Sequence, residues 1–344
     1  MNPELLSLLI SVAFAVGVIA FVAVFALLAI WLERKISAHI QDRLGPMETG
    51  GWHGWSQTMA DTVKLLLKED IFPDAADKPL FRFAPYIVFT AAFATFAVLP
   101  WAQNLIAADI NIGVFYIVSV ASLAVIGILM AGWASNNKWA LYGAMRSAAQ
   151  MVSYEIPVAL SLLVPILIAQ SMSMRDLVMI QQGGFWHWGI FSHLPFGLIA
   201  FVIYFWASLA EVNRNPFDIP EAESELVAGY MVEYSGMRFA MFFLAEYANM
   251  FVVSAVVTAL FLGGWYAPIP WLDVPLEVSP LWHAVVGAAW FAGKGIFLVC
   301  VQMWLRWTLP RLRVDQLMHI CWKVFLPFSF VNILLVSLWV ALSK

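Results

Sequence analysis

The sequence is poor in the residues that hold metals, haem or nucleotides. Its two cysteines, Cys300 and Cys321, lie 21 residues apart, and its six histidines form no HxxxH pair. A CxxC pair, a GxGxxG fingerprint and a phosphate-binding loop are all missing. Such patterns mark zinc, haem and nucleotide sites. We therefore expect this chain to bind no metal, haem or nucleotide by itself, and we expect no nucleic acid partner.

Charge is scarce as well. Only 12% of the 344 residues are charged and 62% are hydrophobic. Uncharged runs of about 18 or more apolar residues are typical of membrane-spanning helices, because a helix rises about 1.5 Å per residue and the hydrocarbon core is about 30 Å thick. The sequence therefore predicts an all-α, polytopic membrane protein with eight transmembrane helices in a single integral-membrane domain, 1–344. Four of the runs carry no charge, and four contain a charge or a polar start: 5–32, 83–108, 110–137 and 324–343, then 147–174, 177–210 (its second half), 239–262 and 280–305.

Basic residues gather in alternate loops. Fifteen of the 18 Lys and Arg residues lie in the loops 33–82, 138–146, 211–238 and 306–323. The positive-inside rule places such loops in the cytoplasm. We therefore expect these four loops on the inner side and both termini on the outer side. The same loops hold 15 of the 22 acids, which suggests a face that docks soluble partners; the alternative is a face that is only solvated.

The segment 51–70, GWHGWSQTMADTVKLLLKED, has helical periodicity. Its apolar and polar residues fall on different faces, so it predicts an amphipathic helix on the inner side. Such a helix either lies in the membrane interface or lines a cavity with its polar stripe. The pattern alone slightly favours the interface. The apolar positions are Trp52, Trp55, Met59, Val63, Leu66 and Leu67, and the polar positions are Gln57, Asp61, Lys64 and Lys68.

Acids concentrate in the stretch 210–236, AEVNRNPFDIPEAESELVAGYMVEYSG, which holds six carboxylates and one base, Arg214. Glu155 and Glu246 lie inside apolar runs, where a charge costs about 2.5–3.5 kcal/mol and is usually functional. Crowded, desolvated carboxylates have raised pKa values and can share protons. The sequence therefore indicates a proton pathway. The alternatives are acids that stay hydrated at the interface, or acids that pair with a docked partner.

Lys294 is a further charge within an apolar run. It is a candidate partner of the acids or a second titrating site. It could equally extend its ammonium group to the membrane surface.

Several long motifs resemble one known family. They follow one another from about residue 20 to 330, and they are similar to the H subunit of proton-pumping NADH:quinone oxidoreductase (respiratory complex I), whose mitochondrial members are called ND subunit 1. Besides the stretch 210–236, the motifs are ERK at 33–35, RLGP at 43–46, ADTVKLLLKED at 60–70, GWASNNKWAL at 132–141, SYEIP at 153–157, FFLAEY at 242–247 and PRLRVDQLMHICWK at 310–323.

The resemblance implies a role at the heel of the complex, where the membrane arm meets the peripheral arm. The inner loops would form part of the quinone chamber together with soluble subunits, and quinone would be the substrate. NADH, FMN and iron–sulphur clusters would be bound by partner subunits, and small membrane subunits and the lipid bilayer would be further partners. No catalytic residue is expected in this chain, and its expected location is the bacterial cytoplasmic (inner) membrane.

The resemblance also assigns roles to individual residues. Matches to the family's motifs imply two sets of functional residues in this chain. The glutamates of the first set would couple quinone chemistry to proton translocation. The proton-coupling set is Glu155, Glu211, Glu221, Glu223, Glu225, Glu233 and Glu246, and the quinone-chamber set is Arg34, Asp61, Lys64, Arg146, Arg214, Phe217 and Asp218.

Two alternatives stand beside this interpretation. A membrane-bound hydrogenase or a related dehydrogenase has a homologous heel subunit, sometimes with another electron donor or without quinone. A stand-alone cation/proton antiporter is a different class of protein. Such transporters are built from internal repeats with ion sites at the midplane of the membrane, whereas this chain has no evident repeat and its acids cluster at one side.

Overall fold

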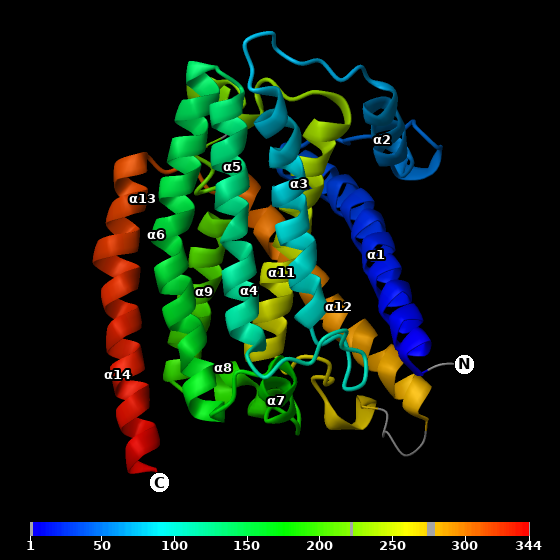
Figure 1. Ribbon diagram of the computed structural model, residues 1–344. Helices are drawn as coiled ribbons and strands as arrows, with labels where there is room; N and C mark the ends of the chain where they lie inside the picture. Colours follow the sequence, from blue (N-terminus) through cyan, green and yellow to red (C-terminus); the bar gives the residue numbers. More distant parts are fainter. Residues whose placement is uncertain (1–2, 221–222, 274–278, 344) are drawn as a thin grey trace.

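The computed structural model describes residues 3–220, 223–273 and 279–343, and the secondary structure in these ranges is helical, without a named strand. Seven helical segments are long and apolar enough to cross a membrane. They form an upright bundle with α1 at one edge and α14 at the other (Figure 1). The segments are α1 (Pro3–Ile40), α3 (Lys78–Thr95), α4 (Gly113–Ala121) with α5 (Leu123–Ala134), α6 (Lys138–Ala169), α11 (Gly236–Phe261), α12 (Pro280–Thr308), and α13 (Val314–Ile320) with α14 (Leu326–Leu342).

The eighth predicted helix corresponds to α9 (Phe196–Glu211), which has only 16 residues. At about 1.5 Å per residue it is shorter than the hydrocarbon core. The polar start of the predicted run forms α7 (Met174–Met179) and α8 (Gly189–Ser192) instead. A short helix is tolerated at membrane depth where protein covers its ends, and here the segment 212–220 beyond α9 is almost entirely buried.

Two segments that the sequence predicted as inner loops are wholly or largely helical. Residues 138–146 are the first turns of α6, and the side chain of its N-cap residue Asn137 accepts a hydrogen bond from the backbone of Trp139. In the segment 306–323, α12 runs to Thr308 and α13 begins at Val314. Charged residues end an apolar run but do not end a helix, so the hydropathy pattern misplaced these boundaries.

α11 is the most buried of the long helices. Phe251, at its middle, contacts aromatic rings from α1, from the η2 turn (Phe96–Val98) that follows α3, and from the connection beyond it. The ring centroids lie 5.0 Å away for Phe21, 5.9 Å for Phe96 and 5.6 Å for Trp101. This cluster fixes α11 against its neighbours, and both Glu246 and Tyr247 lie on the same helix.

α2 (Gln57–Leu67) lies at one end of the bundle, beside α1 (Figure 1). It confirms the predicted amphipathic helix. α1 begins and α14 ends at the opposite end of the bundle (Figure 1). The segment between α9 and α11 contains only the short α10 (Glu223–Leu226) and the turn η4 (Gly229–Met231) among its described residues. Gly143 of α6 crosses this turn closely, since a Cβ atom there would lie 2.6 Å from the Cα of Gly229.

Candidate functional site

A cavity of about 630 Å³ lies between α1, α2, α11 and the last turn of α12. We call it the α2 cavity. Small-molecule sites commonly have volumes of about 300–1,000 Å³. Apolar side chains such as Leu27, Ile30 and Leu244 line one part of it. Charged side chains line the rest: Glu33, Arg34, Asp61, Lys64, Lys68 and Arg306.

α2 turns its polar face toward this cavity and its apolar face away from the protein. Asp61, Lys64 and Lys68 line the cavity, and Arg34 of α1 pairs with Asp61 across it at 2.7 Å. The apolar residues Met59, Val63, Leu66 and Leu67 are exposed. The polar stripe therefore lines a cavity, which was one of the two positions that the sequence allowed for this helix. The outward apolar face is the kind of surface that an interfacial helix presents to lipid.

The far end of α2 is fastened to the start of α11. Arg238 pairs with Asp70 at 3.0 Å, and its guanidinium lies 3.9 Å from the ring centroid of Phe72. Ser235 adds two hydrogen bonds, from the backbone of Ile71 and to the carbonyl of Glu69. These contacts give the charge at position 238 a structural role, because they tie the segment that follows α2 to α11.

A buried ion cluster forms one wall of the α2 cavity. Glu33 of α1 accepts hydrogen bonds from Arg214 at 3.0 and 3.2 Å and from the Tyr247 hydroxyl at 2.6 Å. Arg306 of α12 also donates to it. Arg214 Nε in turn lies 2.8 Å from a carboxylate oxygen of Glu246. We call these five residues the Glu33 cluster. It joins four segments that are far apart in the sequence.

Arg214 carries its charge in a nearly water-free place, since only 2% of its side chain is exposed. Burial opposes the charged form, but the carboxylates of Glu246 and Glu33 outweigh it and raise the pKa of Arg214 well above its ordinary value. The Tyr247 ring lies 4.8 Å from the guanidinium and adds a cation–π contact. The two arginines and two carboxylates of the cluster balance in charge, which is the condition for burying ions.

Amide side chains hold the Arg214 loop in place. Gln150 of α6 donates 2.7 Å hydrogen bonds to the carbonyls of Ala210 and Phe217. Asn215 donates to the carbonyls of Arg306 and Leu309, also at 2.7 Å. These bonds satisfy backbone groups of an irregular segment that is buried, and they bring Arg214 and Arg306 to the same carboxylate.

A second, smaller cavity of about 40 Å³ lies deeper in the bundle. Glu211, Tyr204 and Asn249 line it, and Asn249 is one helical turn beyond Glu246 on α11. Glu155 of α6 is close enough to Glu211 to act on it electrostatically. The volume is sufficient for a water molecule, and the lining offers polar partners for one.

The remaining candidate glutamates have separate partners. Glu225 pairs with Arg146 at 2.6 Å, and Glu233 accepts a 2.6 Å hydrogen bond from Asn137. Glu223 begins α10, and Glu221 lies outside the described residues. Glu225 and Glu233 are therefore held by different side chains, Arg146 of α6 and its N-cap residue Asn137.

The predicted quinone-chamber residues also divide into groups. Arg34, Asp61 and Lys64 line the α2 cavity, and Arg214 lies behind Glu33 in its wall. The other three, Arg146, Phe217 and Asp218, do not line it. Arg146 pairs with Glu225, Phe217 packs on Tyr154 with ring centroids 5.4 Å apart, and Asp218 pairs with Arg311 at 3.0 Å.

Three residues of the Glu33 cluster were not among the sequence candidates: Glu33, Tyr247 and Arg306. Glu33 and Arg306 each follow directly on a long apolar run. That position resembles a helix end at the membrane surface, and only the packing of α1 against α11 and α12 shows that the charges point inward. For Tyr247, the only indication in the sequence was a hydroxyl group directly after the candidate Glu246.

Lys294 has its hydrogen-bond partners at the end of the bundle opposite α2. Its ammonium group donates to the carbonyls of Leu262, Gly264 and Tyr266 at 2.6, 3.0 and 2.7 Å. It also lies 4.4 Å from the ring centroid of Trp188. All three ammonium protons therefore donate to carbonyls of the segment that directly follows α11, and Lys294 holds this segment in place. Lys294 neither joins the Glu33 cluster nor extends to the surface.

Within the described ranges, no three His, Cys, Asp or Glu side chains are grouped as a metal site would require. The guanidinium and ammonium groups of the α2 cavity donate hydrogen bonds and its carboxylates accept them, a combination that suits an organic molecule with polar oxygens.

Comparison with known proteins gives consistent matches. The family model described as NADH dehydrogenase matches residues 13–337. The H subunit of NADH-quinone oxidoreductase from Chlorobaculum tepidum is 56% identical over 326 residues, which cover 94% of this chain and 90% of the relative. The H subunits from Anaeromyxobacter dehalogenans and Bacteroides fragilis are 47% and 46% identical, covering 94% and 98% of this chain and 80% and 92% of the relatives.

Proposed function

We propose that the α2 cavity is the membrane side of the quinone site. The proposal starts from the family: the chain belongs to the NADH dehydrogenase family, as an H subunit of NADH-quinone oxidoreductase. We further propose that its buried glutamates couple quinone reduction to proton translocation. The observation that carries the proposal is the Glu33 cluster: its members Glu33, Tyr247 and Arg306 line the cavity. Arg214, behind them, links Glu33 to Glu246. The relatives' names favour the quinone enzyme over the hydrogenase and antiporter alternatives.

The charges around the cavity suit quinone reduction. Arg34, Lys64, Lys68 and Arg306 outnumber the two acids Glu33 and Asp61. Reduction of a quinone places negative charge on its oxygens before protons arrive, and preorganised cations stabilise such charge in a site of low dielectric constant. The electrons would come from partner subunits that hold NADH, FMN and iron–sulphur clusters, docked at the α2 end of the bundle.

The buried groups offer a path from the cavity into the membrane. A charge change at the quinone alters the balance of the Glu33 cluster, in which Arg214 bridges Glu33 and Glu246. One turn along α11, the cavity beside Asn249 leads to Glu211, and Glu155 follows. In this proposal, protonation of these acids responds to the quinone. Glu221, Glu223, Glu225 and Glu233 would serve the same pathway or dock a partner at its rim.

The arrangement of α2 also supports access from the bilayer. Its exposed apolar face would lie in the lipid while its polar face lines the cavity, so an apolar quinone tail could pass from lipid to cavity along the helix. With α9 as an eighth crossing, both termini lie on the outer side and the basic α2 end lies in the cytoplasm, as the positive-inside rule requires. The membrane would be the bacterial inner membrane.

A cavity-filling variant tests the quinone site. Leu244→Trp places a large ring in the α2 cavity, and Leu334→Trp places the same ring on the exposed face of α14 as a matched control. In membranes that contain the whole complex, we expect the first variant to raise the KM for a short-chain quinone at least tenfold and the second to leave it unchanged. Equal KM values would contradict the assignment of the cavity.

Coupling is tested separately. We expect Glu211→Gln to reduce NADH-driven proton uptake into inverted vesicles, measured with a quenched acridine dye, while Glu48→Gln, an exposed loop acid, does not. If the Glu211 variant pumps as many protons per NADH as the unmodified complex at an unchanged rate, the glutamate pathway is refuted and the quinone site is left standing.

A further inference from the structure

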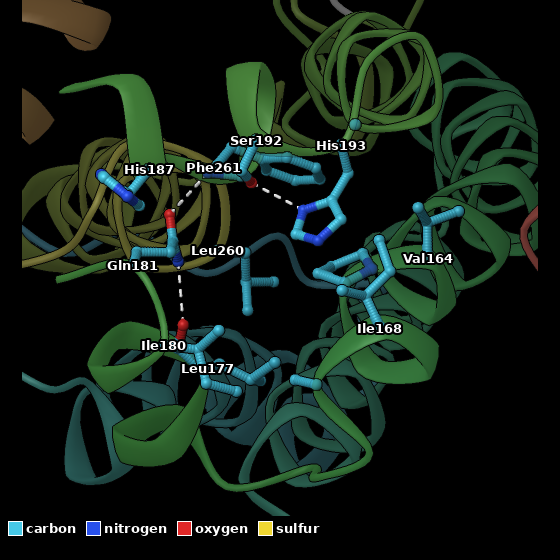
Figure 2. A pocket seen from close by; sticks show the side chains of 14 residues that line it. Val164, Ile168, Leu177, Ile180, Gln181, His187, Ser192, His193, Leu260 and Phe261 are labelled. Atoms are coloured by element: carbon cyan, nitrogen blue, oxygen red, sulfur yellow. Dashed lines mark hydrogen bonds between the residues drawn. The ribbon is translucent and has the colours of Figure 1, made fainter. Parts of the chain in front are cut away.

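A third cavity lies at the opposite end of the bundle from α2, between the ends of α6, α9 and α11 and the short helices α7 and α8 (Figure 2). Its volume is about 260 Å³. Val164, Ile168, Leu177, Leu260 and Phe261 make most of its lining apolar. The proposed quinone chemistry makes no use of it.

One polar pair projects into this apolar space. The Ser192 hydroxyl lies 2.6 Å from Nδ1 of His193, and the imidazole packs edge-on against Trp339 at a centroid distance of 5.6 Å. These contacts fix the ring, and Figure 2 shows it directed into the cavity. Among the described residues, no hydrogen bond involves the other ring nitrogen, Nε2. Depending on the tautomer, that atom donates or accepts one hydrogen bond.

The surroundings of the His193 ring favour its uncharged form. Burial lowers the pKa of His193 below its ordinary value, which favours the neutral imidazole. A neutral ring gives no ionic attraction to a carboxylate or phosphate, so His193 offers a ligand a hydrogen bond and not a charge.

The wall of the cavity is preorganised by Gln181. Its amide nitrogen donates to the carbonyls of Leu177 and Ala259 at 2.9 and 2.8 Å, and its oxygen accepts from the backbone of Gly189 and Gly263 at 2.9 and 3.0 Å. Every hydrogen-bonding position of the amide is therefore occupied within the protein. Gln181 joins α7, α8 and α11 and has no hydrogen-bonding position left for a ligand. The other polar side chains of the lining are Ser192, His193 and His187, whose Nδ1 lies 3.2 Å from the Gly183 carbonyl oxygen.

We propose that this cavity binds a small neutral amphiphile that carries one hydroxyl group on an alkyl or aryl body, of the alkylphenol class. A hydroxyl group both donates and accepts, so it satisfies Nε2 of His193 in either tautomer. An apolar cavity of about 150 Å³ holds benzene, and the larger volume here accommodates a ring with a short chain. The apolar lining recognises that body.

The surroundings of the cavity indicate that such a ligand comes from the membrane interface. Ile180, which lines the cavity, is 52% exposed. Trp186, Phe191 and Leu194 are next in the sequence to lining residues and are exposed as well, with Trp186 67% exposed. Bands of aromatic side chains at this position are typical of the boundary between headgroups and hydrocarbon. Amphiphiles with one polar group concentrate at the same depth, so they are delivered to the cavity at high local concentration.

Photolabelling of the intact complex in lipid nanodiscs tests the proposal. The probe is 4-hexylphenol with a diazirine on the chain, and hexylbenzene with the same diazirine is the matched probe without the hydroxyl group. We expect saturable labelling of Val164, Ile168 or Leu260, about fivefold stronger for the phenol, since one hydrogen bond contributes that order of affinity. Labelling of the lipid-facing residues Leu334 and Leu338 should not saturate and should not distinguish the probes.

Two variants make the test specific. Ile180→Trp blocks the mouth from an exposed position and should abolish the saturable labelling, while His193→Phe keeps a ring against Trp339 and should remove the preference for the phenol. NADH-driven activity of each variant shows that the complex is assembled. Labelling of the lipid-facing residues alone, cavity labelling that survives Ile180→Trp, or equal labelling by both probes would each overturn the proposal.

Discussion

Removal of Arg214 tests whether the Glu33 cluster holds real buried charge. Arg214→Met keeps an unbranched, flexible side chain but removes the guanidinium, which leaves Glu33 and Glu246 with one fewer cation. Arg214 and Glu33 are 2% and 8% exposed, and removal of one partner from such a buried pair costs about 3–5 kcal/mol. At roughly 2 °C per kcal/mol for a chain of this size, the midpoint of thermal inactivation should fall by about 6–10 °C.

Arg34→Met is the matched control for this experiment. It also removes an arginine from an ion pair beside the α2 cavity, but Arg34 and Asp61 are 42% and 33% exposed. Exposed pairs contribute about 0–1 kcal/mol, so the same midpoint should move by no more than about 2 °C. The assay is the NADH–quinone activity that remains in membranes heated at one fixed rate, normalised to the amount of assembled complex.

A double variant distinguishes an unpaired charge from a packing defect. If the loss in Arg214→Met comes from uncompensated carboxylates, the further change Glu246→Gln should recover a large part of it, because neighbouring charges couple non-additively. Equal midpoints for Arg214→Met and Arg34→Met would refute the reasoning. A second loss of similar size on adding Glu246→Gln would refute it as well.

Other parts of the structure give further expectations. Arg238→Ala removes an ion pair and an aromatic contact, so it should release α2, raise the KM for quinone severalfold and speed proteolysis near residue 70, whereas Arg238→Lys should have about half the effect. Lys294→Met leaves three carbonyls without their donor and should cost about 3 kcal/mol, seen as a lower inactivation midpoint with an unchanged KM. Gly143→Ala forces α6 away from the η4 turn and should cost about 1–3 kcal/mol, seen as less assembled complex, while Ala149→Gly should not reduce assembly in this way. Because burial lowers the pKa of His193, its neutral form is favoured by folding, so thermal stability should decrease as the pH falls below about 6.5, and His193→Phe should weaken this dependence between pH 7.5 and 5.5.

The membrane-spanning plan and α2 follow from simple physics of the sequence. Long apolar runs predict spanning helices, and helical periodicity in 51–70 predicts α2. The composition could not show that α9 has only 16 residues, nor that Lys138 and Arg146 are helical, because hydropathy reports the environment of side chains and not hydrogen bonding of the backbone.

The candidate site was predicted less completely, for a related reason. Motif resemblance named Arg214 and Glu246, but a motif is a local pattern and the Glu33 cluster is not. Its members come from α1, the 212–220 segment, α11 and α12, so their contact depends on long-range packing. Asp218 and Phe217 were assigned to the chamber by motif resemblance, and in the structure they contact Arg311 and Tyr154 and do not line the α2 cavity.

The hydrogen bonds of Glu33 also restrict the movement of its side chain. Its two oxygens receive donors from the 212–220 segment, α11 and α12, while its own backbone belongs to α1. A carboxylate that accepts hydrogen bonds from three segments cannot rotate freely. It is therefore poorly suited to carry a proton by changing its rotamer, and well suited to connect the segments that bind it. If one of these donors moves, the hydrogen bonds of the other donors to Glu33 change as well, so four segments that are far apart in the sequence respond together.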